Sequence, residues 1–352
     1  MKISTIVDSK EKRVAITPET AKKYSEIGLE VTLPRDYGIT AMFNDSDYIA
    51  AGAKIEKTKN IPEADLYVAV KPSLAKEIKL KRGSYLIALL SPSHNKEILE
   101  KLIAAGVHPC ALEKIPRITR AQSMDVLSSQ ANISGYRAML EALYHYARIV
   151  PMMMTAAGTV RPAKVLVVGA GIAGLQAIAT AKRLGAIVYA FDVRIAAKEQ
   201  VESLGGTFIS VEDEKNGETA GGYAQEMSDD YKKRQMEKLA QMIAKMDIVI
   251  TTAQIPEKQA PLLVTKEMVA SMPPGAIVLD MATETGGNCE LSKRDETLIV
   301  GNVTIIGHTD FAARVANDSS QLFARNVFNF VSLMIKDGKI DLTDEIIQAV
   351  LI

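Results

Sequence analysis

The sequence predicts an α/β fold with two doubly wound parallel-sheet domains, joined by long helices and with a cleft between them. Three observations predict this class. Short apolar runs alternate with helical stretches in both halves of the chain, which is typical of parallel strands covered by helices on both faces. A glycine-rich turn at residues 169–174 follows one of these runs. The length of 352 residues exceeds what one hydrophobic core usually serves, so about two domains are expected.

The first domain is predicted at residues 1–125, completed by the C-terminal helices of residues 308–352. Thr17 and Pro18 are residue types that begin helices. Residues 123–146 have helical spacing and no proline, so this segment is long enough to link the two domains. Strands are expected at residues 1–8 and at the apolar runs 30–33, 66–70, 85–90 and 107–112, with helices such as 95–105 between them.

The second domain, predicted at residues 126–307, contains the most informative segment of the chain. An apolar run enters a turn with glycines at Gly169, Gly171 and Gly174, a helix of small residues follows, and a second strand ends at Asp192. This order of strand, glycine turn, helix, strand and acid predicts a Rossmann-like dinucleotide-binding domain. The remaining strands of this domain are expected at residues 247–252, 276–280 and 303–306.

Each residue of this fingerprint has its own expected role. Gly169 permits the sharp turn, Gly171 lets a pyrophosphate approach the backbone, and Gly174 lets the helix press on the strand. Free N–H groups at the positive end of the helix would hold the phosphates. Asp192 would accept hydrogen bonds from the ribose of NAD and repel the extra phosphate of NADP, so NAD is the predicted cofactor, while Arg194 keeps NADP open. The alternative is a nucleotide-free α/β unit with a glycine-rich crossing.

Composition excludes several other classes. The 42 basic and 42 acidic side chains cancel, which argues against a nucleic-acid surface. Cys110 and Cys289 are the only 2 cysteines and form no CxxC pair, which fits a reducing compartment. The 4 histidines have no metal-ligand spacing, so no metal is predicted. The N-terminus lacks a signal-peptide pattern, and a buried strand and helix explain the uncharged run 165–181 better than a membrane span.

Two polar segments are candidates for chemistry. The first contains Arg117, Gln122 and Asp125, which can order one another by charge-assisted hydrogen bonds at the expected domain junction. The alternative, purely structural interpretation is a helix start, with Ser123 as N-cap and Asp125 in the first turn. The second is the glycine-rich stretch 217–227, which is interpreted either as a solvated loop or as a lid with a hinge at residues 221–222 and contacts at its tip.

Taken together, residues 117–125, 169–174, 221–223, 247–253 and 286–288 resemble the NAD(H)-binding component of proton-translocating nicotinamide nucleotide transhydrogenase. Alanine dehydrogenase is the nearest relative of that family and shares its fold. The resemblance implies a Si/Re-specific oxidoreductase in which hydride passes directly between NAD(H) on this chain and NADP(H) on a partner subunit. It also implies a homodimer, attached to membrane-spanning partner components at the inner face of the cytoplasmic membrane without inserting into it.

The resemblance further implies site residues. Arg117, Gln122 and Asp125 would form the catalytic group, and Gln122 would help to position the two nicotinamide rings. Residues that would bind the cofactor are Arg117, Gln122 and Ser128 at the nicotinamide and its ribose; Gly222 and Tyr223 in a mobile loop; and Gly169, Gly171, Ile172, Gly174, Asp192, Val193, Arg194 and Gln254 at the pyrophosphate and adenosine.

An alanine dehydrogenase remains the alternative enzyme. Such an enzyme must move protons on an amine and a keto acid, so it needs a general acid and base, whereas hydride exchange between two nicotinamides depends on positioning. The histidine expected on the strand at residues 86–90 is missing, and His94 is the first to follow. Arg13 and Lys71 nevertheless resemble the substrate-carboxylate ligands of alanine dehydrogenase. A non-enzymatic NAD-sensing module is the third interpretation.

Overall fold

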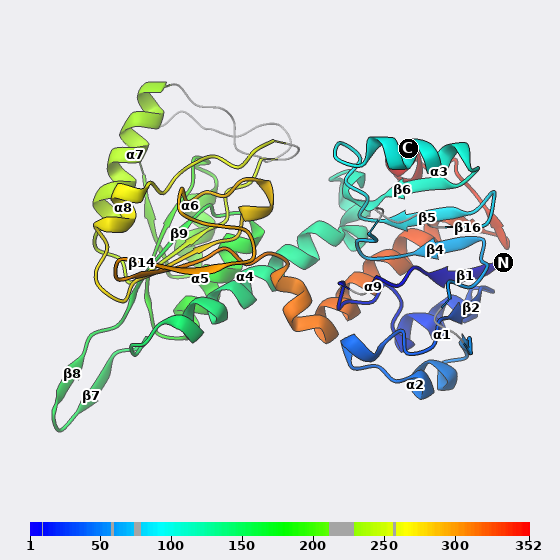
Figure 1. Cartoon of the computed structure of the whole chain (residues 1–352), viewed down its shortest axis with the longest axis horizontal. Coiled ribbons are helices and arrows are strands. Elements are labelled where there is room, and N and C mark those ends of the chain that lie inside the picture. The colour runs from blue at the N-terminus through cyan, green and yellow to red at the C-terminus, as the bar shows by residue number, and fades with distance from the viewer. Residues whose placement is uncertain (9, 58–59, 74–78, 211–228, 256–257) are drawn as a thin grey trace. The chain divides into compact units, whose positions relative to one another are not determined.

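The computed structural model describes the chain except for residues 9, 58–59, 74–78, 211–228 and 256–257 (Figure 1). The chain divides into two compact units, one formed by residues 1–130 with 312–352 and the other by residues 131–311. Each unit contains its own parallel sheet with helices on its faces. The prediction of an α/β fold with parallel, Rossmann-like sheets is therefore confirmed. In the described part of the chain, no helix has both the length and the apolar character that a membrane span requires.

The sheet of the first unit has six strands, all paired in parallel. Their order is β3-β2-β1-β4-β5-β6, so the chain reverses its direction of winding between β1 and β4. The strands predicted from the apolar runs are present, although most are shorter than predicted. They are β1 (Lys2–Thr5), β2 (Glu30–Leu33), β4 (Leu66–Val68), β5 (Tyr85–Ala88) and β6 (His108–Ala111). The short β3 (Lys54–Ile55) at the edge of the sheet was not predicted.

Helices from both ends of the chain cover this sheet. Thr17 caps α1 through a capping box with Thr20, as its residue type predicts. The long α9 returns to the same core, where Phe323 and Phe330 are fully buried in one cluster with strand residues such as Ile3. The helices are α1 (Pro18–Glu26), α2 (Asp45–Ala50), α3 (Lys96–Ala104), α9 (Ala316–Met334) and α10 (Glu345–Val350), with short 3-10 turns η1 (Ile39–Ala41), η2 (Leu112–Lys114) and η3 (Thr119–Met124) and the hairpin β16 (Ile335–Lys336) and β17 (Lys339–Ile340).

The sheet of the second unit repeats this winding order. Six strands run in parallel in the order β11-β10-β9-β12-β13-β15, and β14 adds an antiparallel edge that the sequence did not suggest. The strands are β9 (Lys164–Val168), β10 (Ile187–Phe191), β11 (Thr207–Ile209), β12 (Ile248–Thr251), β13 (Ile277–Asp280), β14 (Thr297–Val300) and β15 (Val303–Ile306). A separate hairpin is formed by β7 (Met153–Thr155) and β8 (Gly158–Val160).

Alternate side chains of these strands enter two different cores. Val165 and Val167 pack in one cluster with Ala177 of α5, while Leu166 and Val168 pack in another with Leu239 of α7. Because successive strand residues point to opposite faces, both faces of this sheet are covered, which accounts for the uninterrupted apolar run. The helices of this unit are α5 (Ile172–Arg183), α6 (Ala197–Ser203), α7 (Asp229–Ile243) and α8 (Lys266–Ala270), with the 3-10 turn η4 (Thr283–Thr285). Two elements belong to both units: α4 (Val126–His145), which begins in the first unit, and the 3-10 turn η5 (Phe311–Val315), which ends in it.

Candidate functional site

The glycine turn joins β9 to α5 at the carboxyl edge of the second sheet. Gly169 has a φ of +99°, a conformation that side chains disfavour, and its N–H donates to Phe191 O at 2.8 Å. A Cβ on Gly174 would lie 1.8 Å from Gly169 O, so only glycine allows the helix to pack this closely. A Cβ on Gly171 would meet no atom within 4 Å, so the backbone before Ile172 faces open space. The turn therefore presents the N-terminal N–H groups of α5 beside an accessible backbone.

Asp192 connects the end of β10 to this turn. The residue is 8% exposed. One carboxylate oxygen accepts from Ala170 N at 2.7 Å and from Arg194 NH2 at 2.9 Å. The other accepts from Arg194 N at 2.8 Å and Arg194 Nε at 2.9 Å. A carboxylate offers about four acceptor positions. A ribose hydroxyl that bonds to Asp192 must therefore share or displace a donor of Arg194.

Two buried residues that the sequence analysis missed organise the loops after β12 and β13. The fully buried Asp280 accepts from three backbone N–H groups and two hydroxyls, which are Ala282 N, Asn288 N, Cys289 N, Thr251 Oγ1 and Ser292 Oγ. The side chain of Asn288 bonds to both the N–H and the C=O of Ala253, at 3.1 and 2.9 Å. Ala253 precedes Gln254, whose Nε2 donates to Met281 O at 3.3 Å. Asp280 thus fixes Asn288, and Asn288 fixes the backbone beside Gln254.

In the first unit, the predicted catalytic residues line one pocket. Arg117, Gln122, Asp125 and Ser128 border a cavity of about 410 Å³ that follows β6, and Gln122 is exposed. The rest of the lining is formed by Pro116, Ile118, Thr119 and Ala121. The pocket brings together guanidinium, amide, carboxylate and hydroxyl groups, which can position a polar ring substituent or a ribose through several hydrogen bonds at once.

The alternative interpretation of residues 117–125 as the start of a helix is correct in part, but a different residue caps the helix. Ser123 lies within η3, and its carbonyl accepts from Asn326 and Asn329. Asp125 stands directly before α4 and accepts from Ser128 N at 2.9 Å, so Asp125 rather than Ser123 caps the helix. The hydroxyl of Ser128 donates to the same carboxylate. Capping therefore holds Asp125 and Ser128 against each other at the pocket.

The segment where an alanine dehydrogenase is expected to carry its histidine makes other polar contacts in this chain. After β5, the N–H groups of Leu90 and Ser91 both donate to the Glu113 carboxylate. Ser91 has a φ of +46°, so this carboxylate holds a backbone conformation that non-glycine residues seldom adopt.

The cysteines offer no nucleophile. Cys110 and Cys289 are free and buried. Burial raises the pKa of the Cys110 thiol to about 12 and that of Cys289 to about 11, so both stay protonated at neutral pH. Among the described residues, no group of three or more His, Cys, Asp or Glu side chains has the arrangement of a metal site. Gly222 and Tyr223 lie outside the described residues.

Two sheets wound in this order, one of them with the glycine turn and an acid at the end of its second strand, define a protein of the dinucleotide-binding α/β class. The family models for the N-terminal and C-terminal domains of alanine dehydrogenase/PNT match residues 6–134 and 138–352. The chain belongs to the alanine dehydrogenase/PNT family, and the resemblance drawn from its motifs is confirmed.

Within this family the chain is similar to transhydrogenase alpha subunits. It is 50% identical over 332 residues to an alpha-subunit chain of the NAD(P) transhydrogenase of Rhodospirillum rubrum, covering 92% of this chain and 86% of that protein. The solved structure of transhydrogenase from Sinorhizobium meliloti matches with a TM-score of 0.90 and 44% identity, over 100% of this chain and 98% of that one. A structure of L-alanine dehydrogenase shares the fold, with a TM-score of 0.83 at 22% identity, over 100% of this chain and 94% of that one.

Proposed function

We propose that this chain is the NAD(H)-binding subunit of a proton-translocating NAD(P) transhydrogenase. In this proposal hydride passes directly between NAD(H) on this chain and NADP(H) on a partner subunit, with Si/Re specificity. The observation that carries the proposal is the pocket in which Arg117, Gln122, Asp125 and Ser128 stand together. The similarity to a transhydrogenase alpha subunit over 92% of the chain supports it.

The second unit, residues 131–311, would be the NAD-binding domain. The open space at Gly171 fits the approach of a pyrophosphate to the backbone, and the N-terminus of the 12-residue helix α5 favours an anion there. Asp192, with its neighbours Val193 and Arg194, stands where the adenosine ribose would bind, and its negative charge favours NAD over NADP. Gln254, held beside Asn288, would complete the adenosine side of the site.

The residues of the first unit would act by positioning. Bound NAD(H) supplies the hydride chemistry, and transfer between two nicotinamides releases no proton at either ring, so no general base is required. Gln122 can donate and accept a hydrogen bond through one side chain, which suits a carboxamide that must be held in one orientation. Asp125, held by Ser128, and Arg117 would fix the ribose and the ring plane. Orientation of this kind can supply several kcal/mol of the barrier reduction.

Partner subunits complete the proposed enzyme. The Rhodospirillum rubrum relative is named as one piece of an alpha subunit, which implies that further subunits exist in that organism. For this chain we propose an NADP(H)-binding component and a membrane-spanning component that couples hydride transfer to proton translocation. The chain would then be cytoplasmic and attached to the inner face of the membrane only through these partners.

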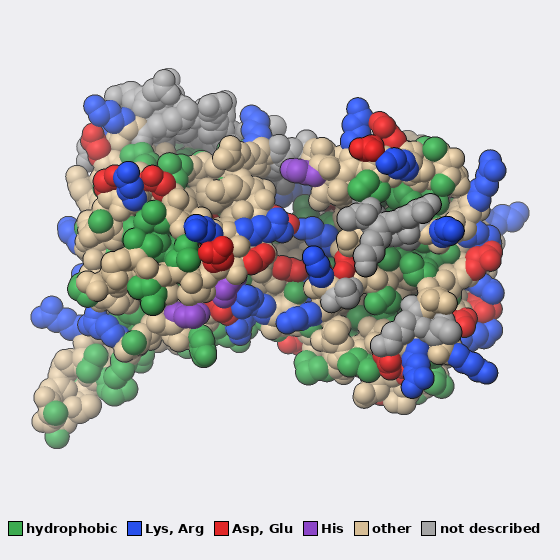
Figure 2. All heavy atoms as spheres, in the orientation of Figure 1, with side chains coloured by type: hydrophobic (Ala, Val, Ile, Leu, Met, Phe, Trp, Pro, Cys, Tyr) green, Lys and Arg blue, Asp and Glu red, His purple; other side chains and the backbone are tan. Residues whose placement is uncertain are grey.

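A homodimer is included in the same proposal, and the β7–β8 hairpin supports it. Met152 and Met154 are 61% and 76% exposed, and hydrophobic side chains follow the hairpin in Figure 2. These two methionines therefore lie outside the hydrophobic cores, and flexible thioether side chains adapt well to a partner surface. Substituting Met154 with Ser should weaken self-association in sedimentation experiments without lowering the melting temperature.

The decisive experiment mixes the purified chain with a separately prepared NADP(H)-binding component and follows hydride transfer from NADH to an NADP⁺ analogue. Transfer that requires both proteins supports the proposal; tight NADH binding without any transfer would refute it. The chain alone should show no reduction of NAD⁺ with L-alanine, because β5 ends without a histidine. Reduction under those conditions would establish the alanine dehydrogenase alternative instead.

A further inference from the structure

Arg13 places a positive charge inside the first unit. Its side chain is 5% exposed, and that of its partner Glu11 is 9% exposed. The two groups pair through two parallel hydrogen bonds, Nε to Oε1 and NH2 to Oε2, each 2.9 Å long. The backbone N–H of Arg13 donates to the same carboxylate at 2.9 Å. A bidentate pair of this geometry is both strong and directional, so the loop at residues 11–13 holds the guanidinium in one orientation.

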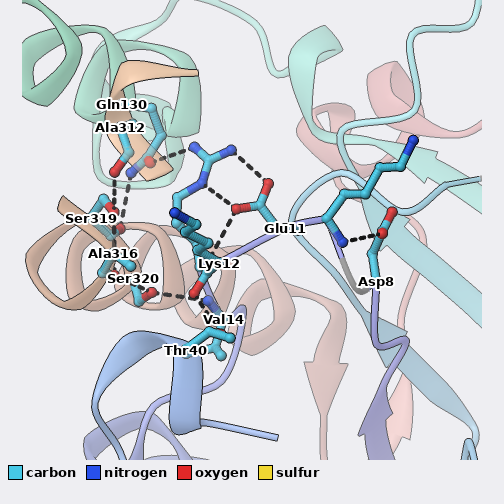
Figure 3. A network of polar contacts seen from close by, with 12 residues as sticks. Asp8, Glu11, Lys12, Val14, Thr40, Gln130, Ala312, Ala316, Ser319 and Ser320 are labelled. Carbon is cyan, nitrogen blue, oxygen red and sulfur yellow. Dashed lines mark hydrogen bonds and ion pairs between the residues drawn. The ribbon is translucent and has the colours of Figure 1, made fainter. Parts of the chain in front are cut away.

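The remaining terminal nitrogen of Arg13 is directed to helix α4. Its NH1 donates to Gln130 Oε1 at 2.8 Å, and Gln130 is 7% exposed. The Gln130 amide nitrogen donates in turn to Ser319 O at 3.1 Å, and Ser319 Oγ donates to Ala312 O at 2.8 Å. Figure 3 shows Gln130 and Glu11 on opposite sides of this network, with Ser319 beyond Gln130. A continuous series of buried hydrogen bonds therefore joins the loop at residues 11–13 to α4 and to the start of α9.

Gln130 lies close along α4 to two residues of the candidate site. Ser128 precedes it by two positions, and Asp125 stands immediately before the helix. Asp125 is tied to the same turn through Ser128 N at 2.9 Å and through its own carbonyl, which accepts from Ser129 N at 3.3 Å. Because a hydrogen-bonded helical turn is rigid, fixing the Gln130 side chain also fixes the rotation of the turn that carries Asp125 and Ser128.

We propose that Arg13 is a positioning residue that holds the first turns of α4 through Gln130, and thereby sets where Asp125 and Ser128 stand in the pocket. This inference rests on the proposed function for the role of the pocket. It assigns Arg13 a different task from the one that the resemblance to alanine dehydrogenase implies. Glu11 and Gln130 accept from three of its five guanidinium N–H groups, so acceptors of this chain hold the side chain in place.

The first test uses Gln130→Leu, which keeps an apolar stem of similar size but removes both the acceptor for Arg13 and the donor for Ser319 O. The matched control is Gln348→Leu, at an exposed position of α10 in the same unit. Hydrogen exchange is measured by mass spectrometry for peptides covering residues 124–131 and, as an internal reference, residues 164–180. We expect exchange at residues 124–131 to rise by roughly 10-fold or more in Gln130→Leu only, with the reference peptide unchanged.

The same variants are then assayed for hydride transfer with the partner component at saturating NADH. Because a displacement of about 1 Å can cost about 100-fold, we expect the saturated rate of Gln130→Leu to fall by about 10-fold. The NADH dissociation constant should stay within about 2-fold, since most cofactor contacts lie elsewhere. If Gln130→Leu shows the same exchange at residues 124–131 and the same saturated rate as the wild type, the proposal is overturned, even if the melting temperature of the variant falls. If the wild-type chain itself transfers no hydride, the proposed function fails, while the exchange measurement still decides whether the hydrogen bonds of Gln130 order the start of α4.

The second test asks directly whether Arg13 binds a carboxylate. The wild-type chain and Arg13→Met are titrated calorimetrically with pyruvate and with L-alanine, in the presence of NADH and NAD⁺ respectively. We expect no saturable heat for either protein. Saturable binding of pyruvate to the wild type that disappears in Arg13→Met would overturn the inference, because Arg13 would then act as a ligand-binding residue and not as a positioning residue.

Discussion

Replacing Asp280 with Asn tests whether one buried carboxylate organises the loops at the carboxyl edge of the second sheet. Asp280 Oδ2 accepts from Asn288 N, Cys289 N and Ser292 Oγ, and Oδ1 accepts from Ala282 N and Thr251 Oγ1. An asparagine has one acceptor oxygen and one NH2 group. In its better orientation the NH2 group replaces Oδ1 and faces the N–H of Ala282, because a hydroxyl can rotate and an N–H cannot.

The expected cost follows from this arrangement. One buried N–H without an acceptor costs about 1–3 kcal/mol, and the remaining hydrogen bonds weaken because they lose their charge, so we expect a total near 3 kcal/mol. For a unit of about 150–250 residues each kcal/mol lowers the melting temperature by about 2–4 °C, which gives a fall of roughly 6–12 °C. NADH affinity should fall as well, because Asn288 would no longer hold Ala253 beside Gln254.

Differential scanning calorimetry and NADH titration measure both effects. Asp337→Asn is the matched control, since Asp337 is exposed in the turn between β16 and β17 and has a φ of +50°, which asparagine tolerates. The reasoning is refuted if Asp280→Asn melts within about 1 °C of the wild type, because an isosteric change that strands a buried N–H group must cost measurable free energy.

Three further predictions concern other regions of the molecule. Gly174→Ala would place a Cβ 1.8 Å from Gly169 O, so α5 must move. We expect about 2–4 kcal/mol of destabilisation and loss of NADH binding in fluorescence titrations. A Gly174→Ala variant with wild-type stability would show that α5 is not tightly packed against the turn. Gln122→Asn keeps the amide but shortens the side chain. The rate of partner-dependent hydride transfer should fall much more than NADH affinity. Equal losses of rate and of affinity would assign Gln122 to NADH binding alone. The Arg325 guanidinium, hydrogen-bonded to Glu19, lowers the pKa of that carboxyl from 4.5 to about 2, so the pair stabilises the fold above pH 4.5 and this contribution is lost as the pH falls towards 2. Because the Glu19 side chain is 40% exposed, Glu19→Gln should lower the free energy of unfolding by under about 1 kcal/mol at pH 7. In urea titrations, the free energies of unfolding of wild type and variant should converge below pH 3. A difference that stays constant with pH would contradict the linkage.

Local patterns predicted the sheets and the glycine turn because their causes are local. The run at residues 165–168 is apolar since both faces of β9 are covered. Gly169 is required by its positive φ and Gly174 by its contact with Gly169 O. The same reasoning identified Arg117, Gln122 and Asp125 as a group, and the family resemblance added Ser128. The structure places all four around one pocket. That these residues bind NAD stays a prediction, as do the domain boundaries and the role of Gly222 and Tyr223.

Long-range polar contacts were beyond reach of the sequence alone. Asp280 draws donors from Thr251, 29 positions earlier, and from Ser292, 12 positions later. Gln130 meets Arg13 across 117 positions and Ser319 across 189. A strand that ends in an acid followed by two glycines is the only sequence signal of the Asp280 network, and nothing in the helical pattern of residues 123–146 distinguishes Gln130 from its neighbours. The alternative interpretation of this segment places the helix cap at Ser123, because a 3-10 turn before a helix resembles a helix start in the sequence.

The burial of both cysteines has a practical consequence for following this protein in solution. Since neither thiol is accessible or ionised at neutral pH, a cysteine introduced on the surface would be the one site at which a maleimide dye reacts quickly. The chain also contains no tryptophan, so a single introduced indole would emit without background and could exchange energy with the dihydronicotinamide fluorophore. An introduced indole could therefore report coenzyme binding, and dyes attached to introduced cysteines could separately report subunit association, in an otherwise native polypeptide.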